Sequence, residues 1–162
     1  MKRILLIILA CSLLVMCKSK KTAAASTTAT EAGKADVQYR DDFRAATAAE
    51  KNALLKELRA YDAGYSVLIF TKGYKGEKIV VSTAGKTVYS GNFISNMKTG
   101  IAAPIRIQNS ADTKVYDNFA KQEVIIPAEE AKKHKYIYLM KDNSRKGNPF
   151  MITYSNTLRP LK

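Results

Sequence analysis

From Gly64 to the end of the chain, short apolar runs alternate with turn residues. The runs are rich in β-branched and aromatic residues, a pattern that predicts strands. Residues 65–71 (YSVLIFT) form the most apolar run, so we expect a central strand there. Eight strands are predicted in all, at residues 65–71, 77–82, 86–92, 101–108, 114–117, 122–126, 135–141 and 150–155.

Turn residues and prolines between and within the runs refine this prediction. Thr83-Ala84-Gly85 separates two runs and predicts a hairpin. Pro104 lies inside a predicted strand, and because proline cannot donate a ladder hydrogen bond, we expect that strand at a sheet edge or a bulge. Residues 127–133, with proline first and lysines last, predict one or two helical turns.

One longer helix is predicted before the strands. Thr47 and Glu50 have the S/T-x-x-E spacing of a capping box. Apolar residues then recur at helical spacing, at Leu54, Leu55, Leu58 and Tyr61. Gly64 can end the helix, which we therefore expect over residues 48–63. Its apolar stripe is short, which favours docking on a sheet over a coiled coil.

These elements predict a mainly β fold. About eight closely spaced strands without long helices between them are typical of an antiparallel sandwich or barrel, here with one N-terminal helix. An α+β sheet with the helix packed on one face is the alternative. Residues 37–162 are long enough to form a single domain with its own core.

The N-terminal stretch MKRILLIILACSLLVMCKSKK has a different pattern. Lys2 and Arg3 precede an apolar run at residues 4–16, and lysines follow it. This is the layout of a secretory signal, and the run is too short to span a bilayer. We therefore expect a signal peptide at residues 1–16. Residues 17–36 are rich in Ala, Thr and Ser, which predicts a disordered tether.

Cys17 lies where the apolar run ends, directly after Leu14-Val15-Met16. This boundary resembles the lipobox of bacterial lipoproteins. The resemblance implies that Cys17 is diacylated through its thiol and becomes the new N-terminus; Cys11, preceded by Ala10, is the alternative. Two or more acyl chains anchor a protein stably to a membrane. The resemblance places the protein in the cell envelope, and Lys18 favours the outer membrane, with the domain in the periplasm or at the cell surface.

Charge and cysteine content narrow the classes of partner. The net charge of +13 favours anionic partners such as lipid head groups or acidic glycans. The lysines are scattered, however, which predicts an evenly coated surface, and export argues against nucleic acid. No cysteine follows Cys17, which excludes a disulfide, a zinc ribbon or thiol-redox chemistry in the domain. We predict no metal and no other cofactor.

Two groups of side chains are candidates for chemistry. His134 is the only histidine and lies among lysines, so we expect a surface residue rather than a metal ligand or a catalytic base. Tyr136 and Tyr138 alternate along one predicted strand and so share a face. With Lys135 and Arg106 they could form a platform for an acidic glycan or peptide. Ordinary cross-strand packing is the alternative.

The sequence thus predicts a membrane-anchored envelope lipoprotein whose β-domain is a non-enzymatic interaction or structural module. Its expected partners are the membrane, through the N-terminal lipid, and an envelope protein. A module that binds an acidic glycan or peptide through the Tyr/Lys face is one alternative. A hydrolase is the other, and it would require a serine or aspartate beside His134.

Overall fold

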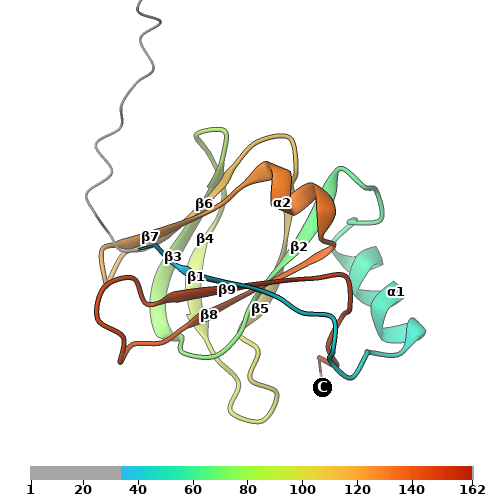
Figure 1. The fold of residues 1–162 in the computed structure, drawn as a ribbon, viewed down its shortest axis with the longest axis horizontal. Coiled ribbons are helices and arrows are strands. Elements are labelled where there is room, and N and C mark those ends of the chain that lie inside the picture. The colour runs from blue at the N-terminus through green and yellow to red at the C-terminus, as the bar shows by residue number, and fades with distance from the viewer. Residues whose placement is uncertain (1–33, 162) are drawn as a thin grey trace, which may run out of the picture. The chain divides into compact units, whose positions relative to one another are not determined.

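The computed structural model describes residues 34–161 (Figure 1). The predicted signal peptide, both cysteines and the predicted tether up to residue 33 lie outside the described residues. The described part contains nine strands and two helices. The strands form two separate sheets, so the prediction of a mainly β fold is confirmed, and the architecture is a sandwich rather than a closed barrel.

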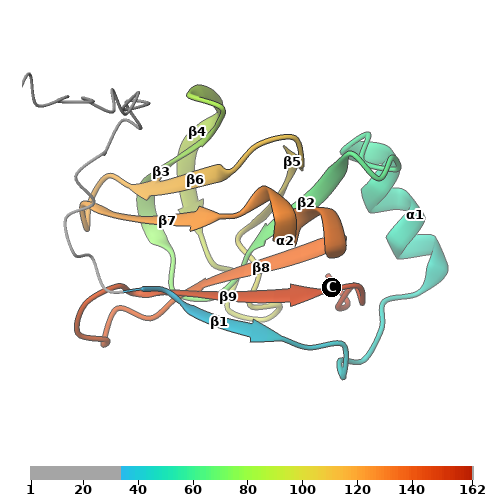
Figure 2. The same cartoon turned by 45° about the horizontal axis from the view of Figure 1, so that its top comes forward.

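The two sheets contain five and four strands. The five-stranded sheet has the order β1 (Asp36–Tyr39), β9 (Phe150–Ser155), β8 (Tyr136–Lys141), β2 (Tyr65–Phe70), β5 (Ala103–Gln108). The four-stranded sheet has the order β4 (Lys86–Ile94), β3 (Lys75–Thr83), β6 (Thr113–Asp117), β7 (Gln122–Ile126). Figure 2 shows the sheets as two layers.

The sequence predicted an antiparallel sandwich, but two of the strand pairs are parallel. In the five-stranded sheet, β1 pairs parallel with β9, and β2 pairs parallel with β8. The short helix α2 (Ala128–Lys133) connects β7 in one sheet to β8 in the other. Strand β1 was not predicted, because its four residues (DVQY) carry a weak pattern and its partner, β9, lies at the far end of the sequence.

Side chains that point between the sheets form the main core. Strand β2 contributes Leu68 and Phe70, and β3 contributes Ile79 and Val81, all fully buried. The rings of Phe70 and Phe93, from opposite sheets, lie 4.3 Å apart between their centroids. Burying each such side chain contributes about 1.5–3 kcal/mol.

A second core lies on the outer face of the five-stranded sheet. Helix α1 (Ala48–Glu57) buries Leu54 and Leu55 against Val67 and Ile69 of β2. The C-terminal segment adds Leu158 to the same cluster. Strand β2 is therefore buried on both faces, which explains why its sequence is apolar without alternation.

Helix α1 begins as predicted and ends earlier than predicted. Both capping-box bonds between Thr47 and Glu50 are present. The helix stops because Arg59 adopts a positive φ of 50°. The N–H of Ala60 then donates to Leu55 O at 2.9 Å and that of Arg59 to Lys56 O at 3.1 Å, the Schellman pattern of helix ends. Arginine fills the position that glycine usually occupies, so the sequence pointed to Gly64 instead.

The predictions of a hairpin turn and of an edge strand are both confirmed. Strands β3 and β4 form a hairpin, and Ala84 and Gly85 in its turn both have positive φ. Strand β5 carries Pro104 and pairs only with β2, so it lies at a sheet edge as expected.

Four connecting segments meet at one end of the sandwich, which we call the loop end. They are residues 71–74, 95–102, 118–121 and 142–149, and the register of the strands places them all at the same strand ends. Strand β1 also begins there, since Asp36 pairs with Met151 near the start of β9. In Figure 1 these loops lie along the left and lower sides, away from α1.

Candidate interaction surface

The outer face of the four-stranded sheet is the candidate functional surface, which we call the open face. Whereas α1 packs on the outer face of the other sheet, the side chains here remain partly or fully exposed. The open face is formed by Lys78, Val80 and Ser82 of β3, Lys114 and Tyr116 of β6, and Glu123 and Ile125 of β7.

Alternation along β6 creates this face. Thr113, Val115 and Asp117 point inward and are buried, so Lys114 and Tyr116 point outward. Tyr116 lies opposite Val80 on β3 and Glu123 on β7. The tyrosine ring therefore has an apolar neighbour on one side and a carboxylate on the other.

Charged side chains surround Tyr116. Lys114 Nζ lies 3.1 Å from Glu123 Oε2, and both side chains are about half exposed. Lys78 lies two residues before Val80 on the same strand face, is exposed, and forms no ion pair with any residue in 34–161. The open face thus combines an aromatic ring, apolar side chains and an unpaired ammonium.

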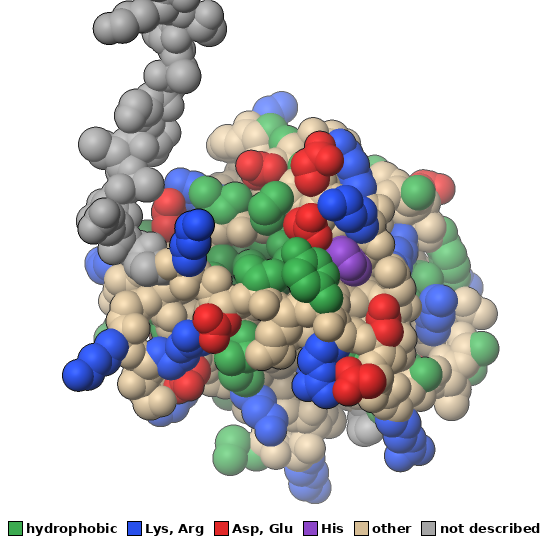
Figure 3. Space-filling model, in the orientation of Figure 1, with side chains coloured by type: hydrophobic (Ala, Val, Ile, Leu, Met, Phe, Trp, Pro, Cys, Tyr) green, Lys and Arg blue, Asp and Glu red, His purple; other side chains and the backbone are tan. Residues whose placement is uncertain are grey.

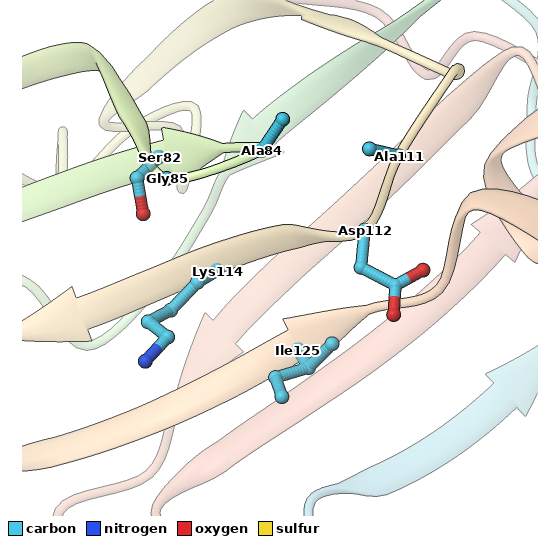
Figure 4. A pocket seen from close by; sticks show the side chains of 7 residues that line it. All are labelled: Ser82, Ala84, Gly85, Ala111, Asp112, Lys114 and Ile125. Atoms are coloured by element: carbon cyan, nitrogen blue, oxygen red, sulfur yellow. The ribbon is translucent and has the colours of Figure 1, made fainter. Parts of the chain in front are cut away.

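A depression of about 460 Å³ opens at one end of this face (Figure 4). It is lined by Ser82, Ala84, Gly85, Ala111, Asp112, Lys114 and Ile125. In Figure 4, Ile125 lies between the Lys114 ammonium and the Asp112 carboxylate. One oxygen of that carboxylate already accepts the N–H of Ala128 at 2.8 Å, which holds the start of α2. The depression is broad enough to receive a protruding side chain or a sugar ring.

The predicted Tyr/Lys platform does not form on the surface. Tyr136 and Tyr138 share one face of β8 as predicted, but α1 and the C-terminal segment cover that face, leaving them 0% and 2% exposed. Tyr138 donates its hydroxyl to Thr157 O at 2.9 Å and accepts the N–H of Arg159 at 2.8 Å. Burial raises the pKa of Tyr138 to about 12. Both rings are core residues.

The two cations of the predicted platform hold loops in place. Lys135 Nζ donates to Asp62 O and Tyr65 O, each at 2.9 Å, and burial lowers its pKa. Arg106 donates to Arg59 O at 3.1 Å, and its guanidinium lies 4.6 Å from the centroid of the Tyr65 ring. Both side chains thus support the turn that follows α1.

His134 is half-buried rather than fully exposed. Its ring lies against Tyr39 and Tyr154, with centroid distances of 5.5 and 5.2 Å. Nδ1 is 3.0 Å from the carbonyl oxygen of Glu130 and 3.8 Å from its carboxylate. The hydrolase alternative would require a serine or an aspartate beside this ring. The carboxylate beside it belongs instead to Glu130. The Ser66 hydroxyl donates to the main-chain oxygen of His134 at 2.8 Å and not to its ring.

Residues Lys114 and Tyr116 were missed as site residues, although β6 was predicted. The signal was present: Lys114 and Tyr116 are two residues apart and so share a strand face, as Tyr136 and Tyr138 do on β8. What the sequence lacked was any indication of which sheet α1 covers. That choice decides which pair of tyrosine and lysine side chains reaches solvent.

Three further observations bear on function. Within residues 34–161, no three His, Cys, Asp or Glu side chains gather as metal ligands would. Neither described helix is long and apolar enough to cross a membrane. Lys and Arg side chains are spread around the face shown in Figure 3 rather than gathered in one block.

The sequence matches no protein-family model, and no curated protein is significantly similar to it.

Proposed function

We propose that this protein is a lipid-anchored envelope protein whose β-sandwich is a non-enzymatic interaction module. The observation that carries the proposal is the open face, where Ile125 is exposed and Tyr116 and Val80 are half-buried among charged side chains. Aromatic and apolar residues ringed by polar ones are typical of protein contact surfaces. The expected partner is an envelope protein.

The membrane anchor in this proposal is the lipid on Cys17, with Cys11 as the alternative. Labelling cells with an alkyne fatty acid should tag the protein, and the tag should be lost in Cys17→Ser. Loss in Cys11→Ser alone would move the lipid to Cys11. Absence of any tag in the unaltered protein would remove the anchor from the proposal.

Photo-crosslinking tests the contact surface. A photoreactive amino acid in place of Tyr116 or Ile125 should give a discrete adduct in intact cells. The matched control is the same replacement at Lys51, which is exposed on α1, at the far side of the other sheet. Equal adducts from all three positions, or none from the open face, would contradict the proposal.

An acidic glycan or peptide is the second candidate ligand, now at the open face. The unpaired Lys78 and the ring of Tyr116 favour it, since stacking and charge act together on such ligands. Retention on an acidic glycan column should fall in Tyr116→Ala combined with Lys78→Gln. Retention equal to that of the unaltered protein would exclude this ligand at this face.

A further inference from the structure

The loop end carries the three most exposed large apolar side chains of the described residues. Met97 is 96% exposed, Phe119 82% and Ile94 69%. Met97 and Phe119 lie on connecting loops, and Ile94 is the last residue of β4. Single exposed apolar side chains are common, but three large ones gathered at one end of the domain mark a candidate contact with an apolar medium.

Unpaired lysines surround these side chains. Five exposed lysines lie at the loop end: Lys72, Lys75, Lys98, Lys121 and Lys146. None forms an ion pair with a carboxylate in residues 34–161.

The carboxylates at this end are already engaged. Glu77 and Asp117 pair with Lys141, and Asp36 pairs with Arg145 at 2.7 Å. Asp142 accepts the N–H and hydroxyl of Ser144 at 3.0 and 2.7 Å. The loop end therefore presents free positive charge around apolar tips.

The N-terminal segment reaches the described domain at the same end. Lys34 directly precedes Ala35 and β1, whose first residue, Asp36, pairs with Arg145 of the 142–149 loop. Even fully extended, the chain from Cys17 to Lys34 spans no more than about 60 Å. A lipid on Cys17 would therefore keep the start of β1, and with it the loop end, within about 60 Å of the bilayer surface.

We propose that the loop end docks on an anionic lipid surface. Met97 and Phe119 enter the head-group region, and the surrounding lysines contact lipid phosphates. An acidic glycan would satisfy the lysines but would offer no hydrocarbon to the apolar tips, which is why we assign a lipid. The orientation relative to the anchor rests on the proposed function, whereas the lipid contact belongs to the domain alone.

Docking in this way would orient the module. The strands would lie roughly perpendicular to the membrane, so the open face would point sideways, parallel to the membrane surface. A lipid on Cys17 already provides attachment. The second contact would turn the open face toward proteins in the same membrane.

Vesicle binding tests the inference without the lipid. All members of both cores lie between residues 35 and 161, and residues 31–162 form a compact unit by themselves. A protein of residues 31–162, which lacks both cysteines and so carries no lipid, can therefore be used in the binding assay. It should co-sediment with phosphatidylcholine vesicles containing phosphatidylglycerol, less so with pure phosphatidylcholine, and less at high salt. No binding to the anionic vesicles would overturn the proposal.

Matched variants locate the contact. Each lysine near an anionic surface contributes roughly fivefold to partitioning, so Lys98→Gln with Lys121→Gln should weaken it by more than about tenfold. Lys51→Gln with Lys56→Gln changes the net charge equally on α1 and should leave partitioning unchanged. A loss from the α1 pair and not from the loop pair would place the contact elsewhere.

Tryptophan fluorescence tests the apolar tips. The chain contains no tryptophan, so Met97→Trp and Phe119→Trp each give a single reporter. Both emissions should shift to the blue on anionic vesicles, and that of Val88→Trp at the opposite end should not. Salt-sensitive binding that is unchanged by Met97→Ser with Phe119→Ser would indicate a polyanion contact instead. A dimer lost in that same double variant would indicate a second copy of the chain.

The two proposals fail separately. Loss of fatty-acid labelling would remove the anchor and leave vesicle binding by residues 31–162 untouched. Absence of vesicle binding would remove the loop-end contact and leave the labelling of Cys17 untouched.

Discussion

Lys141 of β8 forms an ion pair with Asp117 of β6 in the interior of the sandwich, where the two side chains are 1% and 0% exposed. Glu77 of β3 supplies a second carboxylate oxygen, 2.7 Å from the same ammonium. The cluster joins the two sheets, because Lys141 belongs to one and both acids to the other. Two acids on one base leave an excess negative charge, which main-chain N–H groups of Phe119 and Ala120 offset at Asp117.

Removing the base should be the most damaging single change in this cluster. Lys141→Met leaves the buried Asp117 and the partly buried Glu77 without a cation and should cost about 3–5 kcal/mol of unfolding free energy. Urea unfolding of the two proteins measures the difference. Lys146→Met, in the exposed loop next to it, should unfold like the unaltered protein. A loss below about 1 kcal/mol in Lys141→Met would mean that the carboxylates are solvated.

Stability should fall in acid through Glu77. Burial raises the pKa of this carboxyl, but hydrogen bonds from Lys141 and from the Lys75 N–H outweigh burial and leave it below its ordinary value. A carboxyl whose pKa is lower in the folded chain than in the unfolded chain stabilises the fold at pH values above its unfolded pKa. This contribution to the unfolding free energy is lost as the pH falls through the folded pKa. Unfolding free energy should therefore drop below about pH 4, and less steeply in Glu77→Gln. Equal slopes in both proteins would contradict this assignment.

The two buried tyrosine hydroxyls should respond differently to removal. Tyr138 makes two hydrogen bonds with the C-terminal segment, so Tyr138→Phe should cost about 1–2 kcal/mol. The Tyr136 hydroxyl is buried without a partner among the described residues, so Tyr136→Phe should be neutral or stabilising. Chemical unfolding of the two variants and of the unaltered protein measures these differences in unfolding free energy. A loss of about 1 kcal/mol or more in Tyr136→Phe would contradict the absence of a partner for its hydroxyl.

Arg59 should be a position where glycine stabilises. Its positive φ strains a residue with a Cβ, and its side chain is exposed. Arg59→Gly should raise the unfolding free energy by about 0.5–1 kcal/mol, measured by thermal or urea unfolding. The control, Lys56→Gly, lies within α1 and should lower stability by roughly 1 kcal/mol. Destabilisation by both variants would show that the Arg59 side chain contributes more than its backbone costs.

Much of the local structure followed from the sequence. The eight predicted strands and the start of α1 depend on neighbouring residues: alternation, turn residues and the Thr47–Glu50 capping box. All of these interactions act within a few positions of the chain. The sequence also placed β5 at an edge, because Pro104 cannot donate a ladder bond whatever its surroundings.

Only the tertiary structure decided what each face does. Alternation predicted that Tyr136 and Tyr138 share a face, yet not that α1 would cover it and leave Lys114 exposed and Tyr116 half-exposed on the other sheet. The parallel pairing of β1 with β9 and the Lys141 ion pair join residues far apart in the sequence. Such contacts depend on how the sheets and the helix pack, and no local pattern encodes that. Local sequence determined eight of the nine strands and the start of α1, and packing determined which of their side chains can meet a partner.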